Sequence, residues 1–386
     1  MQLVAYGAQD IYLTGNPQIT FFKVVYRRHT NFSMELIEQT WNGSSITNGR
    51  CTATISRNGD LVSQMFLDIA GSPGATDNPG TSWITSVELE IGGQKIDKHS
   101  GKWMEVWSEL TEENPNGTVG DTVAESGVPL GTRFQNMSGA GGVIGTNAAA
   151  RLWVPLRFWF CRNPGLALPL IALQYHEVKV ILEHKFTTTF ANVVVHNKLW
   201  ADYIYLDTDE RRRFAQVSHE YLIEQVQEQS LTVAQGNKDL NFNHPVKELI
   251  WASSTGAAGA VTSTKLICPG TAEDTTFQLK LNGHDRFATQ PLHYFSRTQT
   301  WQHHTGSGLN SDAAGLGGLF GDTICVYSFA LKPEEHQPSG TCNFSRIDNA
   351  QLVVAGLALG LNPHIYAVNY NVLRIMSGMG GLAYSN

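Results

Sequence analysis

Apolar and polar residues alternate with a period of two in most segments of this chain that have a clear pattern. In residues 87–91 and 277–281, apolar side chains fall on one face and charged or amide side chains on the other. A similar alternation runs through residues 154–160 and 178–183. Successive side chains of a strand point to opposite faces of the sheet, so this period indicates half-buried β-strands. The pattern predicts a mostly antiparallel, all-β protein.

Helical patterns are few and short. A helix is expected over residues 101–113, where four apolar side chains share one face at a period of 3.6 residues: Trp103, Val106, Trp107 and Leu110. A second helix is expected over residues 209–216. Two Gly-, Ser- and Asn-rich stretches, residues 114–150 and 303–322, are predicted to be surface loops, because a long segment without regular structure cannot be buried without leaving backbone groups unpaired.

Four short blocks of the first half recur in the second half in the same order. In the first pair, residues 89–94 and 279–284, a strand pattern ends in a tight Gly-containing turn. The other pairs are residues 58–67 with 243–251, 158–160 with 327–329, and 201–206 with 367–373. Because the blocks keep their order, we expect two copies of one β unit.

The boundaries of the two units follow from the repeats and from a dense run of charges at residues 207–213. We expect one unit at residues 21–208 and the other at residues 209–386, with a linker at about residues 207–217. Two all-β halves of about eight strands, with long loops at one end, are typical of jelly rolls. The predicted fold class is therefore all-β: a double jelly roll of two eight-stranded antiparallel β-sandwiches in tandem, with short helices and long loops.

The composition excludes several functions. Charged residues make up only 16% of the 386 residues, and the net charge is −7, which argues against a protein that coats a phosphate backbone. The five cysteines are far apart and form no C-x-x-C pair, so buried, reduced thiols are expected. No secretory signal follows Met1, and the longest apolar run, residues 352–361, is about half the length needed to cross a bilayer. A soluble protein of a reducing compartment is expected.

Catalysis has no support from sequence motifs. The chain has no phosphate-binding Gly-Lys loop, no H-E-x-x-H and no G-x-S-x-G. His303 and His304 are adjacent, so on a strand they would point to opposite faces, and we expect them on a loop surface rather than at a metal. The acidic pairs at residues 112–113 and 334–335 are expected to be solvated turns, because no apolar pocket is apparent around them. No catalytic, cofactor-binding or metal-binding residue is predicted.

Five N-x-[ST] sequons occur, at Asn31, Asn42, Asn116, Asn136 and Asn343. Chance explains most of them in a chain without a secretory signal. Asn116, Asn136 and Asn343 are kept as candidate glycosylation sites.

The N-terminal segment differs from the rest of the chain. Residues 1–20 form a polar arm with glycines and a Gly-Asn-Pro turn, and an aromatic strand carrying cations follows. Such an arm has too little apolar periodicity to bury itself, so we expect it to become ordered by packing across a neighbour. The candidate assembly residues of this arm are Gln2, Tyr6, Gln9, Asp10, Tyr12, Asn16 and Pro17.

Residues 5–32 also closely resemble the N-terminus of the major capsid proteins of nucleocytoplasmic large DNA viruses, above all those of algal viruses and their relatives. The resemblance continues, with a string such as Glu90-Ile91-Gly92-Gly93-Gln94, over most of the chain. Its further segments are residues 55–61, 90–97, 155–160, 164–173 and 369–384.

This resemblance implies a structural protein without catalytic activity or cofactor. It implies a homotrimer of pseudo-hexagonal outline, many copies of which tile an icosahedral capsid. Six similar β units per trimer would pack hexagonally with only threefold symmetry. Low charge fits a surface largely used for contacts with neighbours. The arm would lie at the inner base of the capsid.

The implied partners are other copies of the chain, neighbouring capsomers, minor capsid proteins and an inner membrane, with no direct contact to nucleic acid. The implied location is the virion, after synthesis and assembly in the host cytoplasm. A jelly-roll carbohydrate-binding protein and a minor capsid paralogue are the alternatives.

Overall fold

The structure of the chain, a computed structural model, describes residues 31–73, 77–113, 132–142, 151–254, 264–270, 274–306, 322–356 and 358–384. The seven candidate residues of the N-terminal arm and the sequon at Asn116 lie outside these described residues.

The first half is a sandwich of two antiparallel sheets. Sheet A has the strand order β1-β10-β4-β7, with β8 also paired to β4, and sheet B has the order β2-β3-β9-β5-β6. The strands are β1 Phe32–Gln39, β2 Trp41–Gly43, β3 Gly49–Thr54, β4 Leu61–Pro73, β5 Ile84–Ile91, β6 Gln94–Ser100, β7 Arg151–Pro155, β8 Leu168–Pro169, β9 Val178–His184 and β10 Phe190–Leu206.

The alternation in the sequence decides which side chains fill this sandwich. On β4, Met65 and Leu67 point inward and are buried, whereas Phe66 between them points outward and is only half-buried. On β9, Val180 and Leu182 enter the same core cluster from the opposite sheet. The period-two strands predicted at residues 87–91 and 178–183 are confirmed as β5 and β9, because each inner face buries its apolar residues against the other sheet.

The second half is built in the same way. Sheet C has the order β11-β21-β13-β14, with β18 and β19 paired to β13 and β22 paired to β21. Sheet D has the order β12-β20-β15-β16, with β17 paired to β15. The strands are β11 His219–Ser230, β12 Gly236–Asp239, β13 Pro245–Ser254, β14 Leu266–Ile267, β15 Thr276–Leu281, β16 His284–Asp285, β17 Gln290–Pro291, β18 Ile324–Ser328, β19 Cys342–Asn343, β20 Ala350–Ala355, β21 His364–Met376 and β22 Met379–Leu382.

The two halves repeat the same strand pairing. The order β1-β10-β4-β7 of the first half corresponds to β11-β21-β13-β18 of the second, and β3-β9-β5-β6 corresponds to β12-β20-β15-β16. The register also repeats, because Met65 pairs with Ala201 and Leu249 pairs with Ala367. Within the described residues, each half therefore has eight principal strands in a jelly-roll arrangement, and the predicted double jelly roll is confirmed.

The repeated turns have the same backbone conformation. Gly92 and Gly93 join β5 to β6 with φ of 58° and 85°, and Asn282 and Gly283 join β15 to β16 with φ of 51° and 78°. Two successive residues with positive φ are the requirement of a tight hairpin turn, which glycine and asparagine tolerate best. The first sequence repeat is thus a repeated hairpin.

The helices are short and lie in the connections. They are α2 Pro79–Ser82, α3 Gly101–Thr111, α4 Arg133–Ser138, α5 Trp159–Arg162, α6 Phe186–Thr189, α7 Thr208–Gln216 and α8 Gln299–His303, with the single turns η2 Pro164–Leu166, η3 Leu170–Ala172 and η5 Phe344–Arg346 and the π-helical turn η4 Tyr294–Thr298. The predicted helices at residues 101–113 and 209–216 correspond to α3 and α7 and are confirmed.

Two local predictions are wrong. Residues 154–160 do not form one strand: β7 ends at Pro155 and α5 begins at Trp159. Phe158, Trp159 and Phe160 are all buried, so the apparent alternation there does not reflect one buried and one exposed face. Residues 114–150 are not entirely a surface loop either, because α4 lies within them and Ser138 at its end is fully buried.

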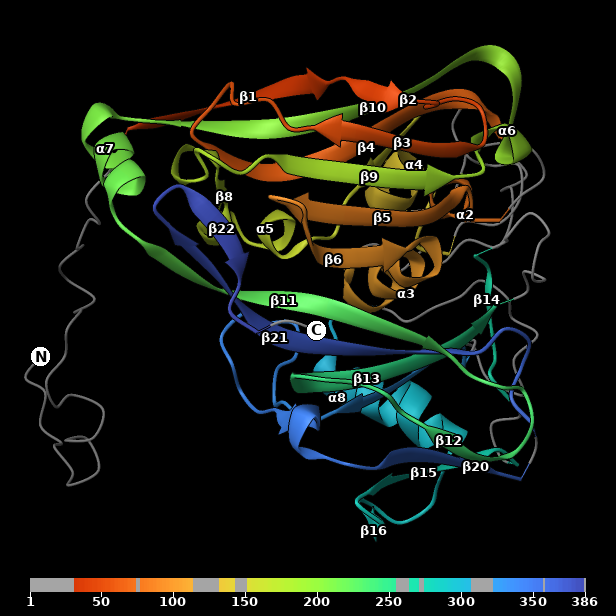
Figure 1. Ribbon diagram of the computed structural model, residues 1–386. Coiled ribbons are helices and arrows are strands. Elements are labelled where there is room, and N and C mark those ends of the chain that lie inside the picture. Colours follow the sequence, from red (N-terminus) through yellow and green to blue (C-terminus); the bar gives the residue numbers. More distant parts are fainter. Residues whose placement is uncertain are drawn as a thin grey trace, which may run out of the picture.

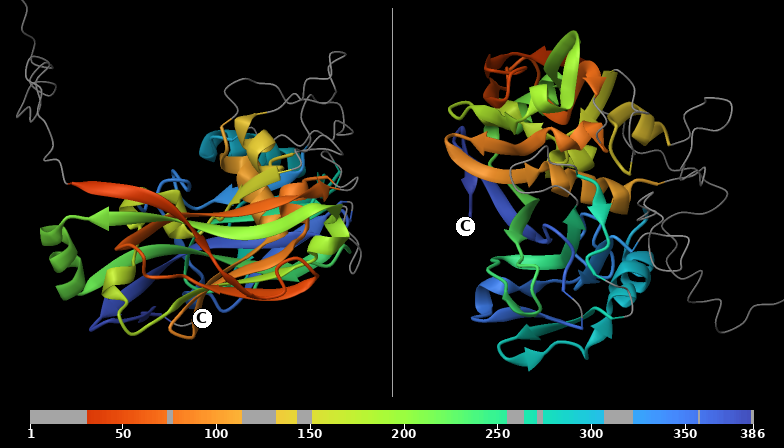
Figure 2. Two further views of the ribbon diagram at one scale, coloured as in Figure 1. Left: turned by 90° about the horizontal axis from the view of Figure 1, so that it is seen from above. Right: turned by 90° about the vertical axis from the view of Figure 1, so that its right-hand side faces the viewer.

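The two halves are stacked on each other with their strands running in similar directions (Figure 1). β6 at the edge of sheet B lies beside β11 at the edge of sheet C, whereas β1 and β16 lie at opposite ends of the stack. Helices α3, α4 and α8 lie on one side of the molecule, and α7 lies at one end of the long axis (Figure 2). None of the helices in the described part of the chain is long and apolar enough to span a membrane.

Candidate functional site

The junction between the two halves is built around helix α3. Ser100 caps the helix by accepting a hydrogen bond from the backbone N–H of Trp103 at 3.2 Å. The apolar face predicted from the sequence packs on the outer face of sheet C, where Trp103 lies 5.1 Å from Tyr366, ring centre to ring centre. The buried residues of this contact are Trp103, Val106, Trp107, Leu110, Ile250, Ala252, Leu266, Ile324, Val326, Tyr366 and Val368. A helix of the first half thus covers a sheet of the second.

The edges of the two sandwiches are also joined. The backbone N–H of Val226 on β11 donates to a carboxylate oxygen of Asp97 on β6 at 3.2 Å, and the Gln225 amide donates to the carbonyl of Ile96. Arg162 of α5 stacks on the ring of Trp107 at 4.0 Å. The two hydrogen bonds to Asp97 and Ile96 satisfy polar groups along two strand edges that would otherwise be open to pairing.

A buried carboxylate, Glu224 on β11, gathers cations from both halves. One of its oxygens lies 2.9 Å from Arg162 of the first half and 2.9 Å from Lys247 of the second. The other oxygen lies 3.5 Å from His336. Burial alone would raise the pKa of Glu224, but these partners lower it to about 2. The carboxylate therefore stays ionised and ties the halves together.

His304 forms a second buried ionic group. Its Nε2 lies 2.9 Å from Glu248 and its Nδ1 lies 2.8 Å from Glu334. Burial would lower the pKa of His304, but the two carboxylates raise it to about 9. The expected loop surface for this histidine is wrong, and Glu334 is not a solvated turn residue. Both errors have one physical cause. His304 pairs with Glu248 and Glu334, which are 56 and 30 residues away in the sequence, and such pairs are visible only once the elements are placed in space.

Helix α3 also carries two fully buried carboxylates, Glu105 and Glu109. Glu105 accepts hydrogen bonds from the backbone N–H groups of Gly141 and Gly142 at 2.7 Å each and from the hydroxyl of Thr81 at 2.9 Å. Burial raises the pKa of Glu105 to about 7 despite these donors, and burial together with the neighbouring Glu105 raises the pKa of Glu109 well above its usual value. No sequence motif marks this pair, although its spacing of four residues places both carboxylates on one helix face.

The other residues singled out from the sequence are acidic residues, sequon asparagines and cysteines. Glu112 is half-buried and pairs with Arg157 at 2.5 Å, whereas Glu113 and Glu335 are exposed. The sequon residues Asn136 and Asn343 are exposed, as are Asn31 and Asn42. All five cysteines are free. Across the part of the chain that the structure describes, no group of three or more His, Cys, Asp or Glu could hold a metal ion.

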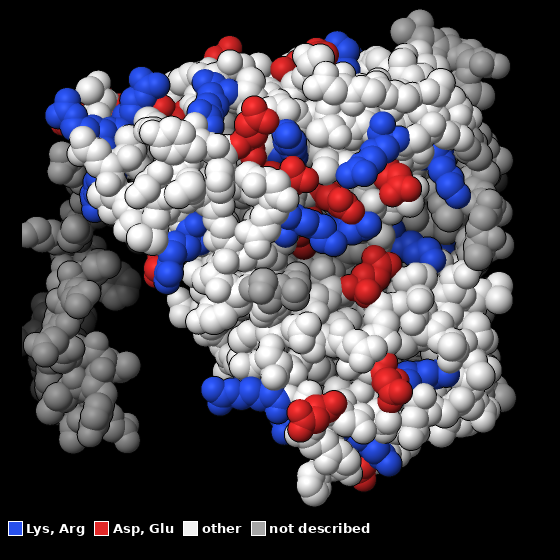
Figure 3. Space-filling view, viewed as in Figure 1, with Lys and Arg blue, Asp and Glu red and all other residues white. Residues whose placement is uncertain are grey.

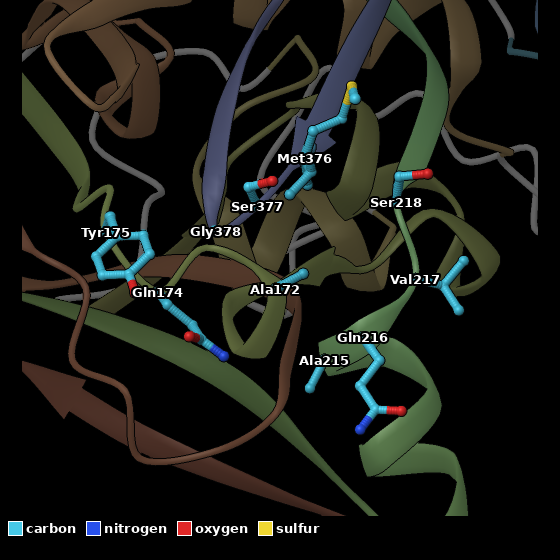
Figure 4. Close-up of a pocket in the computed structure, with 11 residues that line it drawn as sticks. Ala172, Gln174, Tyr175, Ala215, Gln216, Val217, Ser218, Met376, Ser377 and Gly378 are labelled. Atoms are coloured by element: carbon cyan, nitrogen blue, oxygen red, sulfur yellow. The ribbon is translucent and has the colours of Figure 1, made fainter.

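One end of the molecule carries a polar hollow of about 530 Å³ between α7 and the turn that joins β21 to β22 (Figure 4). Tyr175 and Met376 on its rim are exposed. β1 begins close to this end, because Phe32 pairs with Leu206 just before α7. The first described residues of the chain therefore lie at this end, which we name the arm end.

Charge is sparse on the face shown in Figure 3, where Lys and Arg lie among Asp and Glu, with broad uncharged areas between them. No extended basic patch is visible on that face. The distribution on this face agrees with the low charge of the sequence.

The fold places the chain in a class of protein, the double jelly roll. Its buried ionic groups take part in structural contacts. Two family models match the chain: "Major capsid protein N-terminus" over residues 20–207 and "Large eukaryotic DNA virus major capsid protein" over residues 210–381. The chain belongs to this family of major capsid proteins.

Individual relatives agree with this assignment. The chain is 51% identical to the major capsid protein of Pyramimonas orientalis virus, over 100% of this chain and 99% of the relative. It is 41% identical to the major capsid protein of Paramecium bursaria Chlorella virus 1, with the same coverage. A solved structure of the PBCV-1 virus capsid superimposes with a TM-score of 0.75 at 36% identity, over 95% of this chain and 100% of that one. The predicted capsid family is confirmed, and the carbohydrate-binding alternative is not favoured.

Proposed function

We propose that this chain forms the homotrimeric, pseudo-hexagonal capsomer of an icosahedral capsid of a large DNA virus, and that it has no catalytic activity. The observation that carries this proposal is the repeated sandwich itself. Two similar halves per chain provide six similar units per trimer, which pack hexagonally under threefold symmetry. Family membership supports the capsid role, and the virion is the corresponding location.

The proposed units are residues 21–208 and 209–386, with the linker at about residues 207–217. The repeated pairing of Met65 with Ala201 and of Leu249 with Ala367 supports this division. The strand pairing of sheets A and B stays within the first unit, and that of sheets C and D within the second.

The arm, with Gln2, Tyr6, Gln9, Asp10, Tyr12, Asn16 and Pro17, is proposed to join the capsomer to its surroundings at the capsid base. Its support is the arm end, where β1 starts beside α7 and the hollow lined by Tyr175 and Met376. Neighbouring capsomers, minor capsid proteins and an inner membrane are the proposed partners there, after assembly in the host cytoplasm. Nucleic acid is not expected to bind.

Glycan attachment at Asn116, Asn136 and Asn343 is a separate proposal. Exposed side chains at Asn136 and Asn343 support it. The intact mass of the chain purified from virions tests it, because each glycan would add to the mass of 42.4 kDa.

The oligomeric state tests the capsomer proposal directly. Light scattering on the purified chain should give three times the mass of 42.4 kDa across micromolar concentrations. Electron microscopy of the same sample should show particles of hexagonal outline. A chain that stays monomeric throughout this range would contradict the proposal.

A further inference from the structure

The outer face of sheet C is covered by another layer of the protein. Ile250, Val326 and Tyr366 form one row across β13, β18 and β21, because Ile250 pairs with both of the others. Their exposed fractions are 0%, 0% and 1%. Helix α3 of the first half provides the cover, as described above.

The equivalent row on sheet A is also apolar, but its side chains are less buried. Phe66 of β4 pairs with Pro155 of β7 and with Trp200 of β10, just as Ile250 pairs with Val326 and Tyr366. All three side chains remain half-exposed. Trp153 lies beside them, 6.3 Å from Phe66 and 5.9 Å from Trp200 between ring centres.

The apolar surface continues onto the edge strand β1. Phe32, Met34 and Leu36 alternate along one face of β1 and are 59%, 51% and 40% exposed. Their cross-strand partners include Ile204 and Leu206 of β10. Leu36 pairs with Asp202 and Trp200 pairs with Glu38, so two carboxylates lie among these apolar residues. We name the seven apolar residues of this surface the sheet A face: Phe32, Met34, Leu36, Phe66, Trp153, Pro155 and Trp200. Exposed apolar surfaces of this kind mark interaction sites.

The second half carries the helix that corresponds to α3. In the first half, α3 lies between β6 and β7, and in the second, η4 and α8 lie between β16 and β18. Both helices lie on the same side of the molecule (Figure 2). Whereas Trp103 of α3 is fully buried on sheet C, Trp301 of α8 is 82% exposed. Leu331 nearby is 76% exposed, and its carbonyl is 3.2 Å from Nδ1 of His303 on α8.

We propose that α8, through Trp301, docks on the sheet A face of a second copy of this chain, repeating between chains the contact that α3 makes with sheet C within one chain. The first half leaves its sheet A face uncovered, and the second half leaves α8 uncovered. These surfaces correspond to sheet C and α3, which cover each other within one chain, so a second copy of the chain supplies the missing partner of each. Because α8 and the sheet A face are different surfaces of the chain, successive copies meet head to tail. A head-to-tail contact forms a ring when its rotation closes. This inference rests on the proposed trimer.

Two surface variants test the contact from its two sides. Trp301→Ser alters α8, and Met34→Asp places a charge on the sheet A face. Both side chains are exposed in the monomer, so circular dichroism and thermal melting should show folded chains. Each variant alone should lose the trimer and sediment as a monomer at concentrations where the unaltered chain is trimeric. Tyr175→Ser, which removes a 76% exposed aromatic residue at the arm end, is the matched control and should remain trimeric.

Mixing the two variants gives a result that misfolding cannot produce. The Met34→Asp chain retains Trp301, and the Trp301→Ser chain retains its sheet A face, so one native contact can form between them. An equimolar mixture should therefore contain dimers at concentrations where each variant alone is monomeric. Analytical ultracentrifugation separates these species.

The other outcomes contradict the inference in distinguishable ways. Trimers of either variant alone, or a mixture without dimers, would overturn this contact while leaving the trimer proposal intact. Loss of the trimer in Met34→Asp but not in Trp301→Ser would assign the sheet A face to another occupant, such as residues 1–30. A monomeric unaltered chain would contradict the proposed function and this inference together.

Discussion

Nε2 of His304 lies 2.9 Å from a carboxylate oxygen of Glu248, and both side chains are fully buried. Glu334 holds the other ring nitrogen, so the imidazole is placed between two carboxylates from separate segments. Such a group is stable only while both partners are present, because an unpaired buried charge is strongly unfavourable. Its position links the turn after α8 to strand β13 of the second half.

We expect His304→Gln to destabilise the chain by about 3 to 5 kcal/mol, the usual cost of leaving the partner of a buried ion pair without its counter-charge. Urea denaturation measures the change in the free energy of unfolding. His303→Gln is the matched control, because His303 is only half-buried and contacts a single carbonyl. Equal effects of the two substitutions would show that the ionic group contributes nothing specific.

The same histidine predicts a loss of stability in mild alkali. Its pKa is raised from 6.5 to about 9 in the folded chain, so its contribution is fully present below pH 6.5 and is lost as the pH rises through 9. The lost contribution is on the order of 3 kcal/mol, at about 1.4 kcal/mol per pKa unit. The difference in unfolding free energy between the unaltered chain and His304→Gln should shrink between pH 7 and pH 10. A constant difference would contradict the assignment.

Glu109→Gln is expected to stabilise the chain at pH 8. Burial and the adjacent Glu105 raise the pKa of Glu109, so the unaltered chain loses stability as the pH rises and this carboxyl must ionise. Removing the charge should add on the order of 1 kcal/mol at pH 8 and little at pH 4, where both carboxyls are protonated. Thermal melting at the two pH values measures this.

Glu105→Gln should stabilise the chain less than Glu109→Gln does at pH 8, because Glu105 accepts hydrogen bonds from two backbone N–H groups and from Thr81 with its two oxygens. An amide has one acceptor oxygen, so it leaves a donor without its partner. Glu113→Gln, at an exposed position just beyond the same helix, is the control and should change the melting temperature little. Destabilisation by Glu109→Gln at pH 8 would contradict the expected sign.

Deleting residues 2–20 is expected to leave the trimer intact and to impair assembly of the shell. β1 begins at Phe32 and is paired along its whole length with β10, so the sandwich does not depend on the deleted residues for its strand order. Light scattering measures the trimer, and electron microscopy measures shell formation. A chain with residues 2–20 in scrambled order serves as a control of equal length. Loss of the folded trimer itself would show that the arm belongs to the core.

Much of the fold was predictable from local patterns. The period of two identified strands β5, β9 and β15, because the inner face of each is buried. The face shared by Trp103 and Leu110 identified α3 but not what it covers. The alternation failed at residues 158–160, where three consecutive buried side chains lie at the start of helix α5. A period of two identifies a strand that is buried on one face. It cannot identify the structure of a segment whose side chains are buried on every side.

The buried ionic groups could not be predicted. His304 with Glu248 and Glu334, and Glu224 with Arg162 and Lys247, join residues that are far apart in the chain. Nothing in the local sequence around His304 distinguishes it from a surface histidine. The pair of Glu105 and Glu109 was within reach of a spacing argument, but their burial depends on α4 and on the packing of α3 between the halves.

The sequence by itself determined the all-β class, the duplication and the family, because each depends on residue order within short segments. Tertiary structure alone decided which faces are covered. Tyr366 and Trp200 occupy equivalent places on sheets C and A, yet one is buried under α3 and the other is half-exposed. Local sequence cannot distinguish them, since burial depends on whether a second layer packs against the sheet.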